Sequence, residues 1–122
     1  MGAAVGTRGG LPEAVALEWL VDTGADISVL RKSVGSRFDV LPFAATASPT
    51  TGGGGIQVVT GIEAEFEVHS ARSGPQTVRV GGPLGIKSND AAGNLLGIEQ
   101  LVGAGATVAW NPATRSGILG AP

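Results

Sequence analysis

The residues best suited to chemistry in this chain are Asp22-Thr23-Gly24, a carboxylate followed by a hydroxyl and a glycine. Asp and Thr side chains bond nearby backbone groups in tight turns, and Gly accepts a positive φ that other residues resist. Apolar runs flank the triplet at residues 15–21 and 27–30. A carboxylate on a short turn between two apolar walls is partly desolvated and rigidly held, which suits an acid or a base in catalysis. A tight turn with a solvated Asp explains the same three residues, so the triplet alone leaves both interpretations open.

The flanking residues predict the strands that position this turn. Val15, Leu17, Trp19 and Val21 recur at period 2, which is typical of a strand with one buried face. We therefore expect a strand over residues 11–21, a turn over 22–26 and a second strand over 27–30.

The rest of the chain predicts short strands separated by turns. Glu63, Glu65 and Glu67 alternate with apolar residues, which indicates a half-buried strand with an acidic outer face and not a cation site. We expect strands at 57–59, 62–68, 76–80 and 95–96, a loop over 81–93, one or two helical turns at 98–102, and a closing hairpin from 106–110 and 115–119. With 21 glycines against 7 prolines, this pattern is typical of a small all-β barrel or sandwich. Residues 1–10 are expected to form a flexible N-terminal segment, and residues 11–122 a single domain.

Three stretches resemble the retropepsin-like aspartic proteases. Residues 20–26, Leu-Val-Asp-Thr-Gly-Ala-Asp, resemble the active-site signature of that family. Residues 51–56 stand where the family has a glycine-rich flap, and residues 94–97, Asn-Leu-Leu-Gly, resemble the hydrophobic-hydrophobic-Gly stretch beside its catalytic loop. The three stretches follow the family's order and rough spacing over about residues 11–110. The resemblance implies an acid-protease closed barrel with one short helix near the C-terminus.

The resemblance implies an aspartic endopeptidase with Asp22, Thr23 and Gly24 at its catalytic centre. Such enzymes use two carboxylates that share one proton, one as base on a water and the other as acid on the scissile carbonyl. This chain has one Asp-Thr-Gly and no second Asp-Thr-Gly or Asp-Ser-Gly. A competent site therefore needs a homodimer in which two copies of Asp22 meet at a two-fold axis. No metal or organic cofactor is implied.

The resemblance also implies residues that contact an extended polypeptide substrate. These are Ala25, Asp26, Gly53, Gly54, Gly55, Ile56 and Leu96, with Leu30 and Leu84 as further candidates to line apolar pockets. Two points stay open: Asp26 serves equally well as a turn-capping residue, and a flexible loop without a role is the alternative to a flap for the glycine run. Retroviral members carry an Arg after the later glycine, where it pairs with the rim acid. Here that position is Ile98, which favours a nonviral member.

Composition excludes several other classes of function. Hydrophobic residues make up 43% of the chain and charged residues 15%, with a net charge of −2, so no basic field exists for nucleic acid. No apolar run approaches the roughly 18 residues of a membrane span. Cysteine is absent and His69 is the only histidine, which argues against a metal site or a Ser–His pair. The first ten residues lack the apolar region of a signal peptide, which favours the cytoplasm.

Two alternatives remain beside the protease. The first is a catalytically silent retropepsin-like module for dimerisation or peptide binding, consistent with the missing rim ion pair. The second is an unrelated β-barrel structural domain in which Asp-Thr-Gly occurs by chance.

Overall fold

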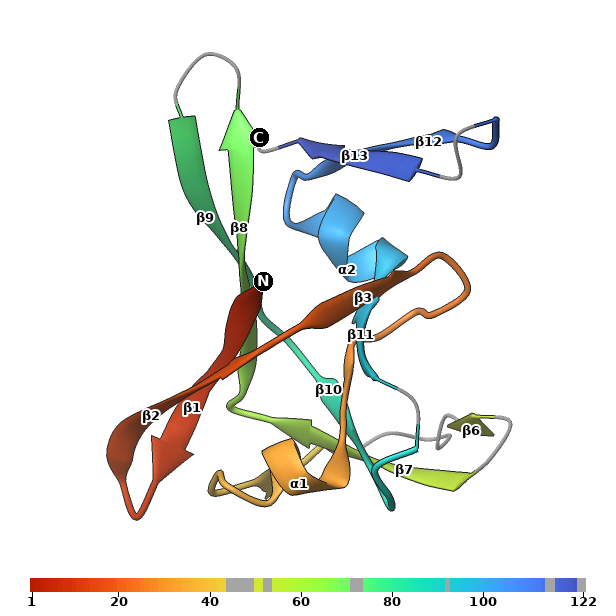
Figure 1. Ribbon diagram of the computed structural model, residues 1–122. Coiled ribbons are helices and arrows are strands. Elements are labelled where there is room, and N and C mark those ends of the chain that lie inside the picture. The colour runs from red at the N-terminus through yellow and green to blue at the C-terminus, as the bar shows by residue number, and fades with distance from the viewer. Residues whose placement is uncertain (44–49, 52–53, 71–73, 92, 114–115, 121–122) are drawn as a thin grey trace.

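The fold is dominated by β-strands, as the sequence predicts (Figure 1). The computed structural model describes residues 1–43, 50–51, 54–70, 74–91, 93–113 and 116–120. Over these residues the strands form one four-stranded sheet, one seven-stranded sheet and a separate two-stranded hairpin. The all-β prediction is therefore confirmed.

The four-stranded sheet is antiparallel and has the order β2-β1-β8-β9. Its strands are β1 (Gly2–Arg8), β2 (Leu11–Leu17), β8 (Glu63–Ser70) and β9 (Gly74–Val80). In β8 the predicted alternation is confirmed, because Ala64, Phe66 and Val68 are buried between the glutamates. Val78 and Val80 of β9 face the same core.

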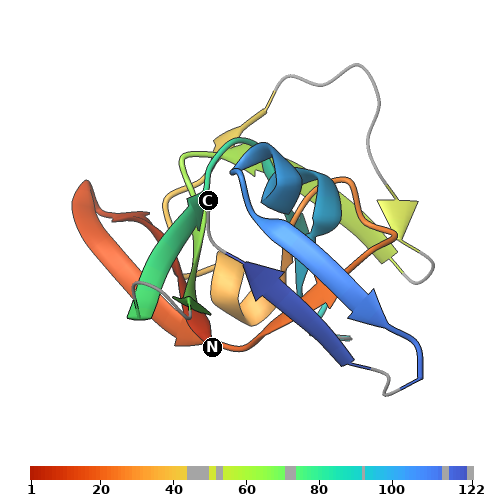
Figure 2. The same cartoon turned by 90° about the horizontal axis from the view of Figure 1, so that it is seen from above.

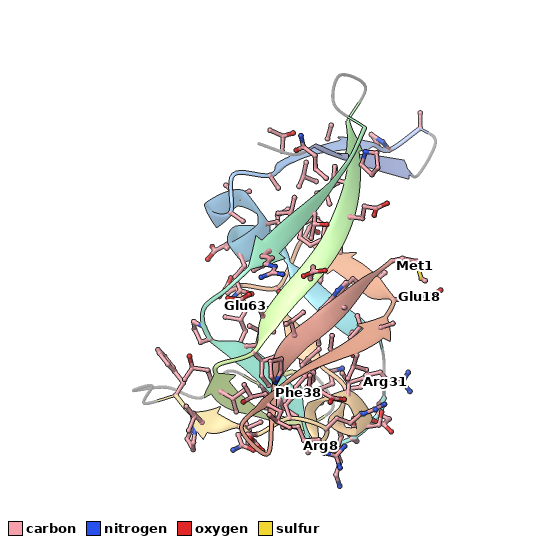
Figure 3. The ribbon with its side chains drawn as sticks, turned by 90° about the vertical axis from the view of Figure 1, so that its left-hand side faces the viewer. Met1, Arg8, Glu18, Arg31, Phe38 and Glu63 are labelled. Carbon is pink, nitrogen blue, oxygen red and sulfur yellow. The ribbon has the colours of Figure 1, made fainter. Side chains whose placement is uncertain are left out.

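The N-terminal residues differ from their expectation. Instead of a flexible segment, residues 2–8 form β1, which pairs with β2 from Gly2↔Leu17 to Arg8↔Leu11 and also with β8. Figure 3 shows Met1 and Glu18 next to each other where β1 begins and β2 ends. Small side chains allow β1 to lie between two strands, and Ala4 is fully buried there. Local composition predicted a flexible segment because it gives no information about pairing with β2 and β8, which lie further along the chain.

The seven-stranded sheet has the order β3-β11-β4-β10-β7-β5, with β6 paired to β7. Its strands are β3 (Trp19–Asp22), β4 (Val29–Leu30), β5 (Leu41–Pro42), β6 (Thr50–Thr51), β7 (Gly54–Thr60), β10 (Leu84–Lys87) and β11 (Asn94–Gly97). The expected single strand over residues 11–21 is divided at Glu18, where the chain passes from one sheet into the other. This division leaves Val21 40% exposed although its period-2 pattern predicted a buried face.

Strand β10 corrects the expectation of a loop over residues 81–93. It lies between β4, to which it is parallel, and β7, to which it is antiparallel. Leu84 is fully buried, and a Cβ at Gly85 would collide with Cγ2 of Ile56. The absence of a side chain at Gly85 is therefore needed for the close approach of β7.

Two short helices and a hairpin complete the chain. They are α1 (Lys32–Gly35), α2 (Ile98–Gly103), β12 (Thr107–Asn111) and β13 (Ser116–Gly120). The predicted helical turns and closing hairpin are confirmed, and the hairpin lies next to α2 in both views (Figures 1 and 2). None of these described helices is long and apolar enough to cross a membrane.

The expected closed barrel is not found among the described strands. β3 and β5 remain the two edges of the seven-stranded sheet, and β2 and β9 the edges of the four-stranded sheet. Side chains from both sheets and from α2 instead share one core, which includes Leu30, Phe66 and Leu101. Burial is thus completed by packing sheet against sheet, without closure of the hydrogen-bond ladder.

Candidate active site

The candidate site is the Asp22 loop, defined as residues 22–28, which joins β3 to β4. Strand β11 lies between these two strands, parallel to β3 with Gly97 opposite Asp22, and antiparallel to β4 with Leu95 opposite Val29. The loop therefore arches over the C-terminal end of β11. The structure brings together the Asp-Thr-Gly stretch and the Leu-Leu-Gly stretch, which are more than 70 residues apart in sequence.

The Asp22 side chain is half-buried at the end of an apolar strand. Its Oδ1 accepts the N–H of Gly24 at 2.9 Å, and its carbonyl accepts the N–H of Ala25 at 3.3 Å. Thr23, Gly24 and Asp26 are exposed, so solvent reaches the loop at its crest. A carboxylate oriented by a backbone N–H and open to solvent on one side can accept a proton from a water or donate one to a substrate oxygen.

Gly97 allows the close packing of the loop against β11. A Cβ at this position would lie 2.7 Å from the carbonyl carbon of Ile27, 2.9 Å from its oxygen and 3.0 Å from the carbonyl oxygen of Ala25. These are backbone atoms, so a side chain could be admitted only by moving the loop. The glycine of the Leu-Leu-Gly stretch is therefore a steric requirement of the site.

A buried serine, which the sequence interpretation did not single out, anchors the far end of the loop. Ser28 is fully buried, its Oγ accepts the N–H of Gly97 at 3.1 Å, and its N–H donates to Oε1 of Gln100 at 2.5 Å. The carbonyl of Ser28 accepts the N–H of Gly85 at 2.9 Å. The signal in the sequence is a hydroxyl inside the apolar run at 27–30, because a buried polar side chain needs partners.

Asn94 joins the two strands that flank β11. It is 7% exposed, its Oδ1 accepts the N–H of Arg31 at 3.0 Å, and its Nδ2 donates to the carbonyl of Glu18 at 3.3 Å. One side chain thus fixes the start of β3 relative to the end of β4. Nothing in the local sequence distinguishes this Asn from a turn residue.

Only some of the residues predicted to form the flap lie within the described part of the chain. Gly53 lies outside the described residues, whereas Gly54, Gly55 and Ile56 begin β7, with Gly55 opposite Thr50 of β6. The β6–β7 pair and the Asp22 loop lie on the same side of the molecule in both views (Figures 1 and 2). The side chains of Ile56 and Ile27 both approach Gly85, which links β7 to the loop.

Three predicted pocket residues belong to the core. Leu30 and Leu84 have no exposed surface, and Leu96 is 1% exposed. In a single chain they therefore offer no surface to a peptide, and the prediction that they line substrate pockets does not fit. Period-2 apolar patterns mark a buried face but do not distinguish a core from a binding groove.

Of two open depressions on the molecule, one borders the Asp22 loop. One, of about 500 Å³, is formed between the loop, the residues before β10 and α2, with Asp26, Pro83 and Gln100 in its wall. The other, of about 660 Å³, lies between α1, β7 and β10 and includes Lys32, Ile56 and Lys87. Over the described residues no group of three or more His, Cys, Asp or Glu side chains is arranged to hold a metal ion.

No family model matches the chain, and no curated protein matches it.

Proposed function

We propose that this chain is one half of a retropepsin-like aspartic endopeptidase, in which Asp22 is the catalytic carboxylate. The proposal rests on one observation above all: Asp22 ends a strand beside β11, on a loop packed directly against Gly97. This arrangement unites two of the three stretches on which the resemblance depends. A chance Asp-Thr-Gly has no reason to lie against a distant Leu-Leu-Gly.

An exposed apolar surface beside Asp22 supports the association of two copies. Leu20 is 61% exposed and Val21 40% exposed, and both belong to β3, which is an edge strand of its sheet among the strands that the structure describes. Exposed apolar residues on an unpaired edge favour association with another chain. A second copy meeting this surface across a two-fold axis would bring its own Asp22 close to the first.

The proposed chemistry uses the two carboxyl groups in complementary protonation states. Like charges held about 3 Å apart do not both ionise readily, so the pair retains one proton over a range of pH. The ionised Asp22 removes a proton from water as its oxygen attacks the peptide carbonyl carbon, and the protonated Asp22 of the second copy donates to the carbonyl oxygen. Collapse of the tetrahedral intermediate transfers a proton to the leaving nitrogen and breaks the C–N bond.

The decisive experiment is peptide hydrolysis by mixed dimers. Wild type and Asp22→Asn are mixed in varying ratio at constant total concentration, at acidic pH and with a library of unstructured peptides. If each site needs two Asp22 carboxyls, activity falls as the square of the wild-type fraction. Asp39→Asn, at an exposed carboxylate on another loop, is the matched control. Mixing it with wild type at constant total concentration should leave the activity unchanged.

The outcomes separate the candidate functions. A linear fall in activity would contradict the shared site, and full activity of pure Asp22→Asn would exclude the catalytic assignment. A stable dimer that binds peptides but leaves them intact would identify the silent binding module instead.

A further inference from the structure

The side-chain amide of Gln100 bridges the Asp22 loop and the segment that precedes β10. Its Oε1 accepts the N–H of Ser28 at 2.5 Å, and its Nε2 donates to the carbonyl of Pro83 at 2.8 Å. Gln100 is half-buried and projects from α2, which begins directly after Gly97. We infer that Gln100 is a positioning residue that holds the second half of the Asp22 loop in register with β11. The inference rests on the proposed function for its effect on catalysis.

The two ends of the loop are held by different means. At the first end, the β3–β11 ladder places Asp22 opposite Gly97. At the other end the loop enters β4, which has only two residues, so the Ser28 backbone depends on Gln100 and Gly85 for its hydrogen bonds. Removing the amide would leave the Ser28 N–H without its acceptor and allow the intervening backbone to shift. Displacement of a catalytic group by about 1 Å can reduce a rate by about 100-fold.

Only a neutral amide satisfies both partners at every pH. The Ser28 N–H requires an acceptor and the Pro83 carbonyl requires a donor, which fixes the orientation of the Gln100 amide. An ionised carboxylate in the same place would keep the first bond but turn an oxygen towards the Pro83 carbonyl. A protonated carboxylic acid has one O–H donor and one acceptor, and so restores both bonds.

This difference makes Gln100→Glu a test that reports on the bridge itself. We expect its kcat, divided by that of wild type at the same pH, to fall about tenfold or more where the new carboxyl is ionised. The ratio should return towards one at acidic pH, where the carboxyl is protonated. Gln100→Leu, which has neither donor nor acceptor, should show the loss at every pH. The test is read from the pH dependence of kcat and not from KM, because Ala25 and Asp26 on the same loop are proposed substrate contacts and their displacement would also change KM.

Glu99→Gln is the matched control, since it changes the charge of the neighbouring exposed residue on the same helix. Its pH profile should follow that of wild type. A Gln100→Glu profile parallel to wild type, or a Gln100→Leu variant with wild-type kcat, would overturn the positioning role.

A second measurement does not require activity. Amide hydrogen exchange of Ser28 and Gly85 should accelerate in Gln100→Leu relative to Glu99→Gln, while exchange in β8 and β9 stays unchanged. If wild type hydrolyses no peptide, the proposed function fails and the exchange rates alone decide whether the bridge exists. If wild type is active and exchange at Ser28 is unaltered in Gln100→Leu, only the inference about Gln100 fails.

Discussion

The β2-β1-β8-β9 sheet and the neighbourhood of the Asp22 loop are held together by different interactions. In the sheet, alternate residues of β8 and β9 enter a continuous apolar core, and the backbone ladders run for seven residues between β1 and β2 and between β8 and β9. Around the loop, the ladders are short and individual polar atoms of Ser28, Asn94 and Gln100 complete the structure.

The sheet contributes mainly to the stability of this fold, whereas the interactions around the loop mainly fix the positions of individual atoms. Apolar burial is roughly proportional to area and has little directional preference, so the sheet gains stability without fixing single atoms. Hydrogen bonds and close backbone packing depend on distance and angle. They therefore fix the positions of the loop atoms while adding little to the free energy of unfolding. Substitutions in the sheet should therefore change stability most, and substitutions around the loop should change activity most.

The largest loss of stability is expected from Phe66→Ala in β8. Phe66 is 4% exposed, and truncation of a buried Phe costs about 3–5 kcal/mol. Phe43→Ala, at a residue that is 44% exposed, should cost less than about 1 kcal/mol. Urea unfolding measures both, and equal losses would show that the sheet is not the main source of stability. The fraction of Phe66→Ala that remains folded should retain wild-type kcat.

Gly97→Ala should reduce the free energy of unfolding less than Phe66→Ala does, but it should reduce peptide hydrolysis more. The added methyl group meets the backbone of Ala25 and Ile27, and overpacking of this kind costs about 1–3 kcal/mol. Gly93→Ala is the control, because a Cβ there meets nothing within 4 Å. Unfolding and peptide hydrolysis are measured on the same samples. Full kcat in Gly97→Ala would contradict the view that the loop requires its close contact with β11.

Ser28→Ala should have a smaller effect on stability. It removes the oxygen that accepts the Gly97 N–H, and a buried donor left without its partner costs about 1–2 kcal/mol. Ser88→Ala, at an exposed serine after β10, should be close to neutral. Denaturant unfolding of the two variants gives the comparison directly. Identical free energies of unfolding would show that the Ser28 hydroxyl contributes nothing to the loop.

The smallest effect concerns two exposed carboxylates outside the Asp22 loop. The N–H groups of Gly10 and Gly9 hold the pKa of Asp39 below its ordinary value of 3.8, and the N–H of Ser33 does the same for the pKa of Asp90. Because both pKa values are lower in the folded state, the stabilisation is present above about pH 3.8 and is lost as the pH falls through the folded pKa values.

Asp39→Asn and Asp90→Asn should therefore flatten the acidic side of a plot of Tm against pH. The change should be slight, since both groups are fully exposed and solvent screens them. The pH profile of peptide hydrolysis should stay that of wild type. A shift of that profile would show that these carboxylates are coupled to the Asp22 loop and do not act on stability alone.

Periodicity predicted much of the fold because it reports burial directly. The acidic face of β8 and the helical turns after Gly97 follow from local patterns. Glycine and alanine were less informative, because the same residues serve a flexible segment and a tightly packed strand. For this reason β1 and β10 were expected as a flexible segment and a loop.

The candidate site was predictable in its carboxylate but not in its supports. Asp22 carries a local motif, and the resemblance indicated that residues 94–97 lie beside it. Gln100 has no such signal, and the resemblance assigned no role to the side chain of Asn94. The partners of these two side chains are 72 and 63 residues away along the chain. Their roles became visible only when the structure placed those backbone groups within hydrogen-bonding distance.

By itself the sequence determined that the chain is β-rich, that it carries one Asp-Thr-Gly, and that apolar strands lead into and out of this turn. These are local properties, set by side-chain period and turn chemistry. The tertiary structure alone decided that β11 separates β3 from β4, that the sheets stay open, and that three of the expected pocket residues are core. Each of these depends on pairing between distant segments, which is determined by the total burial of the chain and by no single stretch of it.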